Sequence, residues 1–361
     1  MLVVLIVATL AATAAASLGR TLLQDASGAA GALRARTAAD GALTTVLANW
    51  PSTWTTVLIP GGSDTRTITS PAGSATVRAL RLDVRRYLLT ADATSAAVAG
   101  PVGPAVRRTG VFAQLDNVAY DVPAVVVAAG PVSLATDTDV RAADAPPPTW
   151  SDCVTTPDVP PAAVAAPSAT LATGARVAGS VVTAPATWTP PVPERFGDVD
   201  RATLAARADV ILTAGGTFTP VPRAAPAPDP ACARDAASWG EPLRGPGAVT
   251  NCTTDYPVIH IRGPGSSTIR GPARLQGTLL VDGSLDVVGR VEVAGLVVVG
   301  GTVQSSTGSL VVDGALLARG NGAALGTGSR VRRSRCALER AAAAASRPVP
   351  LARRAWVDVV R

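Results

Sequence analysis

The sequence contains no lysine and a single histidine, His260, so the side chains that most often serve as general bases, nucleophiles and metal ligands are almost missing. The Gly-containing segment 262–267 has no lysine to complete a phosphate-binding loop. His260 lies within Val-Ile-His-Ile-Arg-Gly, where we interpret it as a strand side chain. These absences argue against catalysis. We expect no enzyme activity, no cofactor, no metal site and no small-molecule substrate.

Aromatic residues make up only 3% of the 361 residues, and charged residues only 16%. A thick aromatic core is therefore excluded. The apolar residues are mainly Val, Leu and Ala, which suit thin, repetitive β structure and small helices. The net charge is +6, but no basic cluster is interleaved with stacking aromatics, so we expect no nucleic-acid partner. The composition predicts a mainly β protein with some α-helix.

The four cysteines form no C-x-x-C pair, which disfavours a zinc site or a thioredoxin-type site. In an exported chain an even number of cysteines indicates two disulfides, and four cysteines allow three pairings. Cys232 and Cys252 enclose the shortest loop, which is the least costly to close. The pair Cys153–Cys336 then follows by elimination.

Residues 1–18 carry no charge, and a helix of this length spans roughly 27 Å, close to the bilayer core of about 30 Å. A cleaved signal peptide is one interpretation, because residues 14–16 are Ala-Ala-Ala. A membrane anchor is favoured instead, because an apolar stripe continues at helical spacing as far as Trp50, before Pro51. This stripe comprises Leu22, Ala26, Ala29, Leu33, Ala39, Leu43, Val46, Leu47 and Trp50. We predict an N-terminal membrane or stalk helix over residues 1–50.

This pattern, a hydrophobic first half that continues into an amphipathic second half, resembles the N-terminal helix of type IV pilin-like proteins. Residues 38–50, Ala-Ala-Asp-Gly-Ala-Leu-Thr-Thr-Val-Leu-Ala-Asn-Trp, are similar to the helix end in PilX-type pilus assembly proteins. The resemblance implies that the helix contacts the membrane and other pilin-like or envelope assembly proteins. Small residues such as Gly19, Gly28 and Gly31 would permit close helix packing.

Residues 51–144 are predicted to be a β-rich region with a small antiparallel sheet, because apolar and charged residues alternate between turn signals. From residue 145 prolines become frequent, and proline cannot supply a sheet interior. We therefore predict an irregular Pro/Ala-rich insertion over residues 145–255, with a flexible linker as the alternative. One short helix is expected near residues 198–210, with Asp198 or Asp200 as its N-cap.

The strongest pattern is a glycine at every sixth residue, with one residue inserted midway: Gly271, Gly277, Gly283, Gly289, Gly295 and Gly301, then Gly308, Gly314, Gly320 and Gly326. Aliphatic residues follow most of these glycines after two and four positions. The alternation indicates short strands, and the glycines indicate bends between them. Three such units form a coil of about 18 residues that stacks on the next coil. Residues 256–330 are therefore predicted to be a short parallel β-solenoid, with serial antiparallel hairpins as the alternative.

The 18-residue period also predicts which side chains lie side by side, and these can be compared with what the known solenoid enzymes require. It places Asp286 beside Gln304 and Glu292 near Val311, so no acidic cluster gathers on one face, as a polysaccharide lyase would need for its cation. Hexapeptide acyltransferases require a small residue at a position that Val281, Val287 and Val293 occupy here. Neither enzyme class is favoured.

The Gly-spaced aliphatic units resemble the β-solenoids of bactofilins. Residues 252–259, Cys-Thr-Thr-Asp-Tyr-Pro-Val-Ile, and residues 334–340, Ser-Arg-Cys-Ala-Leu-Glu-Arg, are similar to blocks that flank the corresponding region of PilX-like envelope proteins. Residues 331–361 are predicted to be a C-terminal helix and tail. The helix, over residues 334–346, is expected to be capped by Ser334 and to cover the open end of the solenoid.

Together these features predict a non-catalytic, pilin-like structural component of the cell envelope. Its helix would anchor it in the membrane, with the ectodomain in the periplasm or at the cell exterior. The alternative is a secreted β-solenoid that acts as a surface or glycan-binding module after cleavage of a signal peptide.

Overall fold

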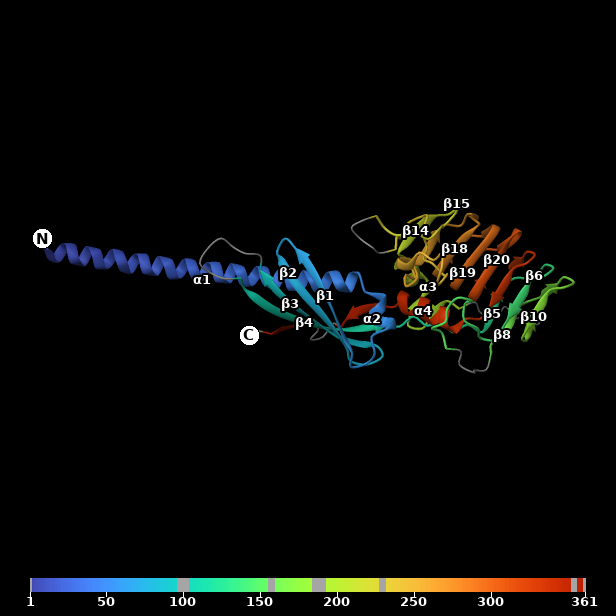
Figure 1. Ribbon diagram of the computed structural model, residues 1–361, viewed down its shortest axis with the longest axis horizontal. Helices are drawn as coiled ribbons and strands as arrows, with labels where there is room; N and C mark the ends of the chain where they lie inside the picture. Colours follow the sequence, from blue (N-terminus) through green and yellow to red (C-terminus); the bar gives the residue numbers. More distant parts are fainter. Residues whose placement is uncertain are drawn as a thin grey trace. The chain divides into compact units, whose positions relative to one another are not determined.

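The computed structural model describes residues 2–95, 104–154, 160–183, 193–226, 232–351 and 356–359. The side chains of residues 2–12, 14, 52, 56 and 356–359 lie outside this description. The chain divides into two compact units, Met1–Asp116 with Arg347–Arg361, and Asn117–Ser346 (Figure 1). Most of the regular structure is β, as the composition predicts.

The first unit is a long helix packed on an antiparallel sheet. Helix α1 (Leu2–Ala48) is followed by the short helix α2 (Ser52–Thr56). The sheet order is β1 (Ser63–Ser70), β2 (Gly73–Arg81), β3 (Arg86–Ser95) and β4 (Val106–Asp116). The last strands of the chain, β23 (Arg347–Pro350) and β24 (Trp356–Val359), both pair antiparallel with β4. The predicted antiparallel sheet is confirmed, but residues expected to form a C-terminal tail extend it.

Buried and exposed side chains alternate along the strands, and the buried ones mark the face of the sheet that the helix covers. Val77, Leu89 and Val111 are fully buried beneath α1, while the neighbouring residues of each strand are more exposed. On the helix the buried positions are mainly small, which allows close approach of helix and sheet: Ala35, Ala38, Ala39, Ala42, Leu43 and Val46. Tyr87 donates its hydroxyl to the carbonyl of Trp54 at 2.9 Å and so fixes α2 against β3.

The second unit is built from parallel strands, and their pairings arrange them in three stacks. Stack A contains residues 273–276, 291–294 and 310–313, then β22 (Arg330–Arg332), β7 (Asp139–Arg141) and β10 (Arg176–Ala178). Stack B contains β14 (Val210–Thr213), β16 (Val258–Arg262), residues 278–281, 296–299 and 315–318, β5 (Ala124–Ala128), β8 (Ala162–Ala166) and β11 (Val181–Thr183). Stack C contains β15 (Thr217–Phe218), β17 (Ser267–Arg270), residues 285–288 and 303–307, β21 (Ala323–Leu325), β6 (Val132–Leu134) and β9 (Ala169–Leu171).

Three long strands bend from one stack into the next: β18 (Ala273–Val281) passes through stacks A and B, and β19 (Leu285–Val299) and β20 (Val303–Ala318) pass through all three. Leu285 pairs with Val303, 18 residues later, and the inserted residue is absorbed as a register shift between Asp286 and Val288. The two predicted pairs, Asp286 with Gln304 and Glu292 with Val311, are observed. The antiparallel alternative is wrong for this region, because all of these pairings are parallel.

The order of the strands in the stacks differs from their order along the chain. After β20 and β22, the stacks continue with β5 and β7 from the earlier segment 124–141, and then with β8 and β10. The prediction of an irregular insertion over residues 145–255 is therefore wrong for residues 162–183 and 210–218. Their prolines lie beside the strands, as Pro161 and Pro167 do at β8, where no ladder hydrogen bond is lost. The predicted β-rich region 51–144 is likewise divided between the two units.

Side chains that point into the space between the stacks form a continuous apolar core. It includes the predicted aliphatic positions of the repeat, such as Leu279, Val291, Val297 and Leu316. Outward-facing Leu280, Leu296 and Leu317 of stack B are also buried, because α4 (Arg335–Ala345) lies against them. The expectation that this helix covers the open end is wrong: its Leu338 and Ala341 pack on the outer face of stack B, and β22 pairs with β7.

Two predicted helix caps are present. The Ser334 hydroxyl accepts from the Ala337 amide of α4 at 3.4 Å, and Asp200 accepts from the Thr203 amide at 2.7 Å at the start of α3 (Arg201–Ala206). The remaining elements of this unit are short: β12 (Arg195–Phe196), β13 (Val199–Asp200) and the 3₁₀ turn η1 (Thr250–Cys252).

Candidate functional site

The two halves of α1 present their apolar residues in different ways. Ala39, Leu43 and Val46 are buried on the sheet, whereas Leu18, Leu22 and Leu33 are each about two-thirds exposed. At about 100° per residue, these three leucines lie within about 60° of one another, and the buried Leu43 lies only about 20° from Leu18. The predicted stripe is therefore a single row of residues that is buried on the sheet in its later part and exposed in its earlier part. The part of α1 as far as Leu33 carries a row of exposed leucines that belongs to no apolar cluster of the described residues.

The glycines of α1 also fall into two groups: some have open space around them, and one packs against the same chain. Gly19 and Gly28 have open space where a side chain would lie, with nothing within 4 Å. Gly31 instead faces Ala105 of the same chain. A Cβ added to Gly31 would lie 3.4 Å from the Cβ of Ala105. The expectation that Gly31 serves packing between chains is wrong, because it serves packing within this unit. Gly19 and Gly28 lie in the free half of the helix, next to the exposed leucines.

Most of the side chains in the predicted membrane segment 1–18 lie outside the described part of the structure. Over the residues that are described, no helix has a stretch long and apolar enough to cross a membrane.

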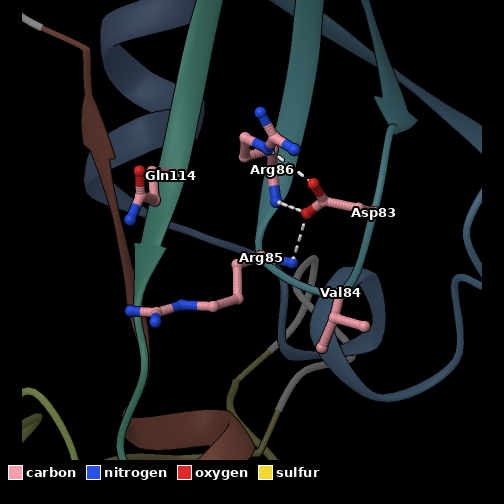
Figure 2. A pocket seen from close by; sticks show the side chains of 5 residues that line it. All are labelled: Asp83, Val84, Arg85, Arg86 and Gln114. Carbon is pink, nitrogen blue, oxygen red and sulfur yellow. Dashed lines mark hydrogen bonds and ion pairs between the residues drawn. The ribbon is translucent and has the colours of Figure 1, made fainter.

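A pocket of about 400 Å³ lies at the turn between β2 and β3 (Figure 2). Asp83 lines this pocket and accepts hydrogen bonds from the backbone amides of Arg85 and Arg86, at 2.8 and 2.7 Å, and from Arg86 Nε at 2.5 Å. The Arg85 amide, followed by the Arg86 side chain, lowers the pKa of the Asp83 carboxyl. Gln114 and the 69% exposed Val84 complete the lining. The charged groups of this pocket hold a tight turn together, so its geometry indicates a structural role.

His260 lies on β16 with its side chain on the outer side of stack B, as a strand residue. Its Nε2 is 3.0 Å from Asp282 Oδ2, and it is only 8% exposed. Asp282 also accepts from Arg201 Nη2 at 2.8 Å and from the Gly263 amide at 3.1 Å. Burial opposes ionisation of Asp282, but its hydrogen bonds, that of His260 first, lower its pKa below the ordinary value. The cluster fastens α3 to the parallel strands.

Trp150 is the centre of a second polar cluster. The Cζ atoms of Arg244 and Arg340 lie 4.4 and 4.9 Å from its ring centroid, and its Nε1 donates to the Pro242 carbonyl at 2.6 Å. Both guanidinium groups also donate to the Tyr256 hydroxyl. Burial, the largest influence on Arg244, lowers its pKa. This cluster joins three distant parts of the second unit, and the sequence offers no local signal for it.

The four predicted cysteines form the two predicted disulfides, Cys153–Cys336 and Cys232–Cys252. Within the described residues, no group of three or more His, Cys, Asp or Glu side chains is arranged to hold a metal ion. No protein-family model, no curated protein and no solved structure matches the chain.

Proposed function

We propose that the chain is a non-catalytic, pilin-like structural component of the cell envelope that assembles through the first half of α1. The observation that carries the proposal is the division of this helix. Residues 35–46 of the helix are buried against an antiparallel sheet of the same chain, and the part before them presents Leu18, Leu22 and Leu33 about two-thirds exposed, outside every apolar cluster of the described residues. An exposed apolar row on a helix is costly in water, so it indicates contact with another helix or with lipid.

We further infer that the three stacks of the second unit wind as a β-solenoid. The 18-residue register from Leu285 to Val303 and the inward aliphatic residues support this inference. Two disulfides favour an oxidising compartment, such as the periplasm or the cell exterior. The uncharged residues 1–18 support membrane attachment. The partners would be other pilin-like or envelope assembly proteins that offer matching helices.

The test is fractionation of native cells, with mass spectrometry of the mature N-terminus. We expect the chain in the membrane fraction or in surface-sheared filaments, with an intact helix. The variant Leu18→Gln/Leu22→Gln/Leu33→Gln should move it to the soluble fraction. The matched control, Thr21→Gln/Ser27→Gln, changes exposed or half-exposed polar positions on another side of the same helix and should not.

A soluble wild-type product that begins after residue 16 would contradict the proposal and favour the secreted alternative. So would equal assembly of the leucine variant and its control. Intact disulfides and an unchanged circular dichroism spectrum would establish that each variant is folded.

A further inference from the structure

The outer face of stack A carries a grid of arginines over its last three strands. Val331, Val140 and Val177 point inward from β22, β7 and β10, so the residues on either side of each valine point outward. The strand registers place these outward residues in two columns: Arg330, Asp139 and Arg176 in one, and Arg332, Arg141 and Ala178 in the other. We call these six positions the arginine grid.

The grid has four guanidinium groups and one carboxylate. Asp139 accepts from Arg141 Nε at 2.8 Å, and Arg332 Nε donates to Asp313 of the preceding strand at 2.5 Å. Arg330 and Arg176 form no ion pair or hydrogen bond through their side chains with any described residue, and the Nε of Arg330 is shielded from solvent without an acceptor. The grid therefore keeps positive charge that the described part of the chain does not neutralise.

The register also sets like charges side by side. Arg332 pairs directly with Arg141 on the neighbouring strand. Like charges at directly paired positions destabilise a sheet, and a neutral residue at either position would remove this repulsion. Residues that destabilise the fold locally in this way are expected where a surface binds a ligand. The acidic residues nearest in sequence, Asp137 and Asp144, lie beyond the grid, and Asp144 accepts from the Arg335 amide.

The spacing of the grid suits a linear ligand. Neighbouring strands are about 4.8 Å apart, which places Arg330 and Arg176 about 10 Å apart along the stack, and the two columns are separated by about 7 Å. Guanidinium groups bind carboxylate and sulfate oxygens through paired N–H donors. A polymer with acidic groups repeated along one edge could contact several arginines in succession, which a single small anion could not do.

We propose that the arginine grid binds a linear acidic polysaccharide. A nucleic acid is less suitable, because no grid position is aromatic and bases would have nothing to stack on. A protein partner is less suitable because Ala178 is the only apolar residue of the six, and protein interfaces have an apolar centre. The proposal rests on the strand registers of the second unit and not on assembly through α1, so the two can fail separately.

The test uses the full chain, purified in detergent with both disulfides intact, and sodium polygalacturonate as the probe. Binding is measured by affinity electrophoresis and biolayer interferometry, with dextran as a neutral polymer and single-stranded oligothymidylate as a nucleic-acid competitor. The variant is Arg176→Ala/Arg330→Ala. Its matched control is Arg262→Ala/Arg270→Ala, which removes the same charge from two exposed arginines of stacks B and C.

We expect polygalacturonate to bind and dextran not to bind, with affinity that falls as salt is raised. The grid variant should bind at least tenfold more weakly, and the control within twofold of wild type, with equal unfolding midpoints for both. Three results would overturn the proposal: no binding of polygalacturonate at low salt, equal weakening in the control, or oligothymidylate binding as tightly with the same dependence on Arg176 and Arg330.

Discussion

Cys153 and Cys336 are bonded to each other across 183 residues, and the bond joins the loop after β7 to the first turn of α4. Trp150 lies in the same cluster as both cysteines, under the guanidinium groups of Arg244 and Arg340. Helix α4 is held to the stacks on one side by apolar packing and on the other by this covalent and aromatic cluster. The position of α4 therefore depends on a segment almost two hundred residues earlier in the chain.

Loss of this disulfide should destabilise the second unit more than loss of the other. In the chain-entropy model the long loop closed by Cys153–Cys336 is worth about 5 kcal/mol, and the 20-residue loop of Cys232–Cys252 about 3 kcal/mol. We expect Cys153→Ser/Cys336→Ser to lower the free energy of unfolding by the larger amount. Chemical denaturation of both double variants measures this. The reverse order would show that the long loop is already restrained by other contacts.

Replacement of Trp150 by Ala should cost about 3–5 kcal/mol, because it removes a buried indole and leaves Arg244 and Arg340 over a cavity. Trp150→Phe keeps an aromatic face for both cations but removes the hydrogen bond to the Pro242 carbonyl, so its loss should be clearly smaller. Urea denaturation, with the disulfides intact, gives both values. Equal losses would mean that the hydrogen bond, and not the ring face, is the main contribution of Trp150.

The sequence predicts the repeat well because its signals are local. A period of two sets which residues point inward, and a glycine every six residues sets the bends, so the pair Asp286–Gln304 follows by counting. The N-caps Asp200 and Ser334 are also local signals. The disulfide pairing follows from loop length.

The sequence does not predict the features that depend on distant partners. β5 stacks on residues 316–318, which form a strand of the same apolar type, so neither sequence identifies the other as its partner. Strands of only three to five residues between prolines are also too short to show a clear periodicity. In α1, Leu33 and Leu43 look equivalent in sequence, but only Leu43 faces the sheet. The arginine grid likewise requires the register of three strands, one of which, β10, comes from the segment 145–255 that looks irregular.

Acidification should weaken the attachment of α3. Hydrogen bonds from His260, the Gly263 amide and Arg201 keep the pKa of Asp282 below its ordinary value despite partial burial. A group with a lowered pKa in the folded chain stabilises it above the unfolded value of about 4, and this stabilisation is lost as the pH falls through the folded value. Asp282→Asn should therefore reduce the fall in stability below pH of about 4. Urea midpoints measured against pH test this, with Asp286→Asn as a control that should behave as wild type.

Replacing a glycine that has a positive φ by alanine should cost different amounts at different positions of the second unit. Gly277, Gly295 and Gly314 pair in register, and Gly295 has a φ of +136°. A Cβ on Gly295 would overlap the carbonyl oxygen of Gly277 on the neighbouring strand β18, so alanine there would add a steric clash to the backbone strain of about 1–3 kcal/mol. Gly289 also has a positive φ, of +72°, but a Cβ there would meet the Gly271 oxygen only at 3.2 Å. Gly245 has a φ of +92° and open space around it.

We therefore expect the loss of stability to increase from Gly245→Ala through Gly289→Ala to Gly295→Ala. All three glycines have a positive φ, so alanine is strained at each, and the three positions differ in how closely other backbone atoms approach. Thermal and urea unfolding of the oxidised protein would rank them, and Gly289→Ala remains informative if Gly295→Ala does not fold. Equal losses at Gly245 and Gly289, with a folded Gly295→Ala protein of similar stability, would show that the stacked strands can separate at Gly295 and that backbone strain alone selects glycine at these positions.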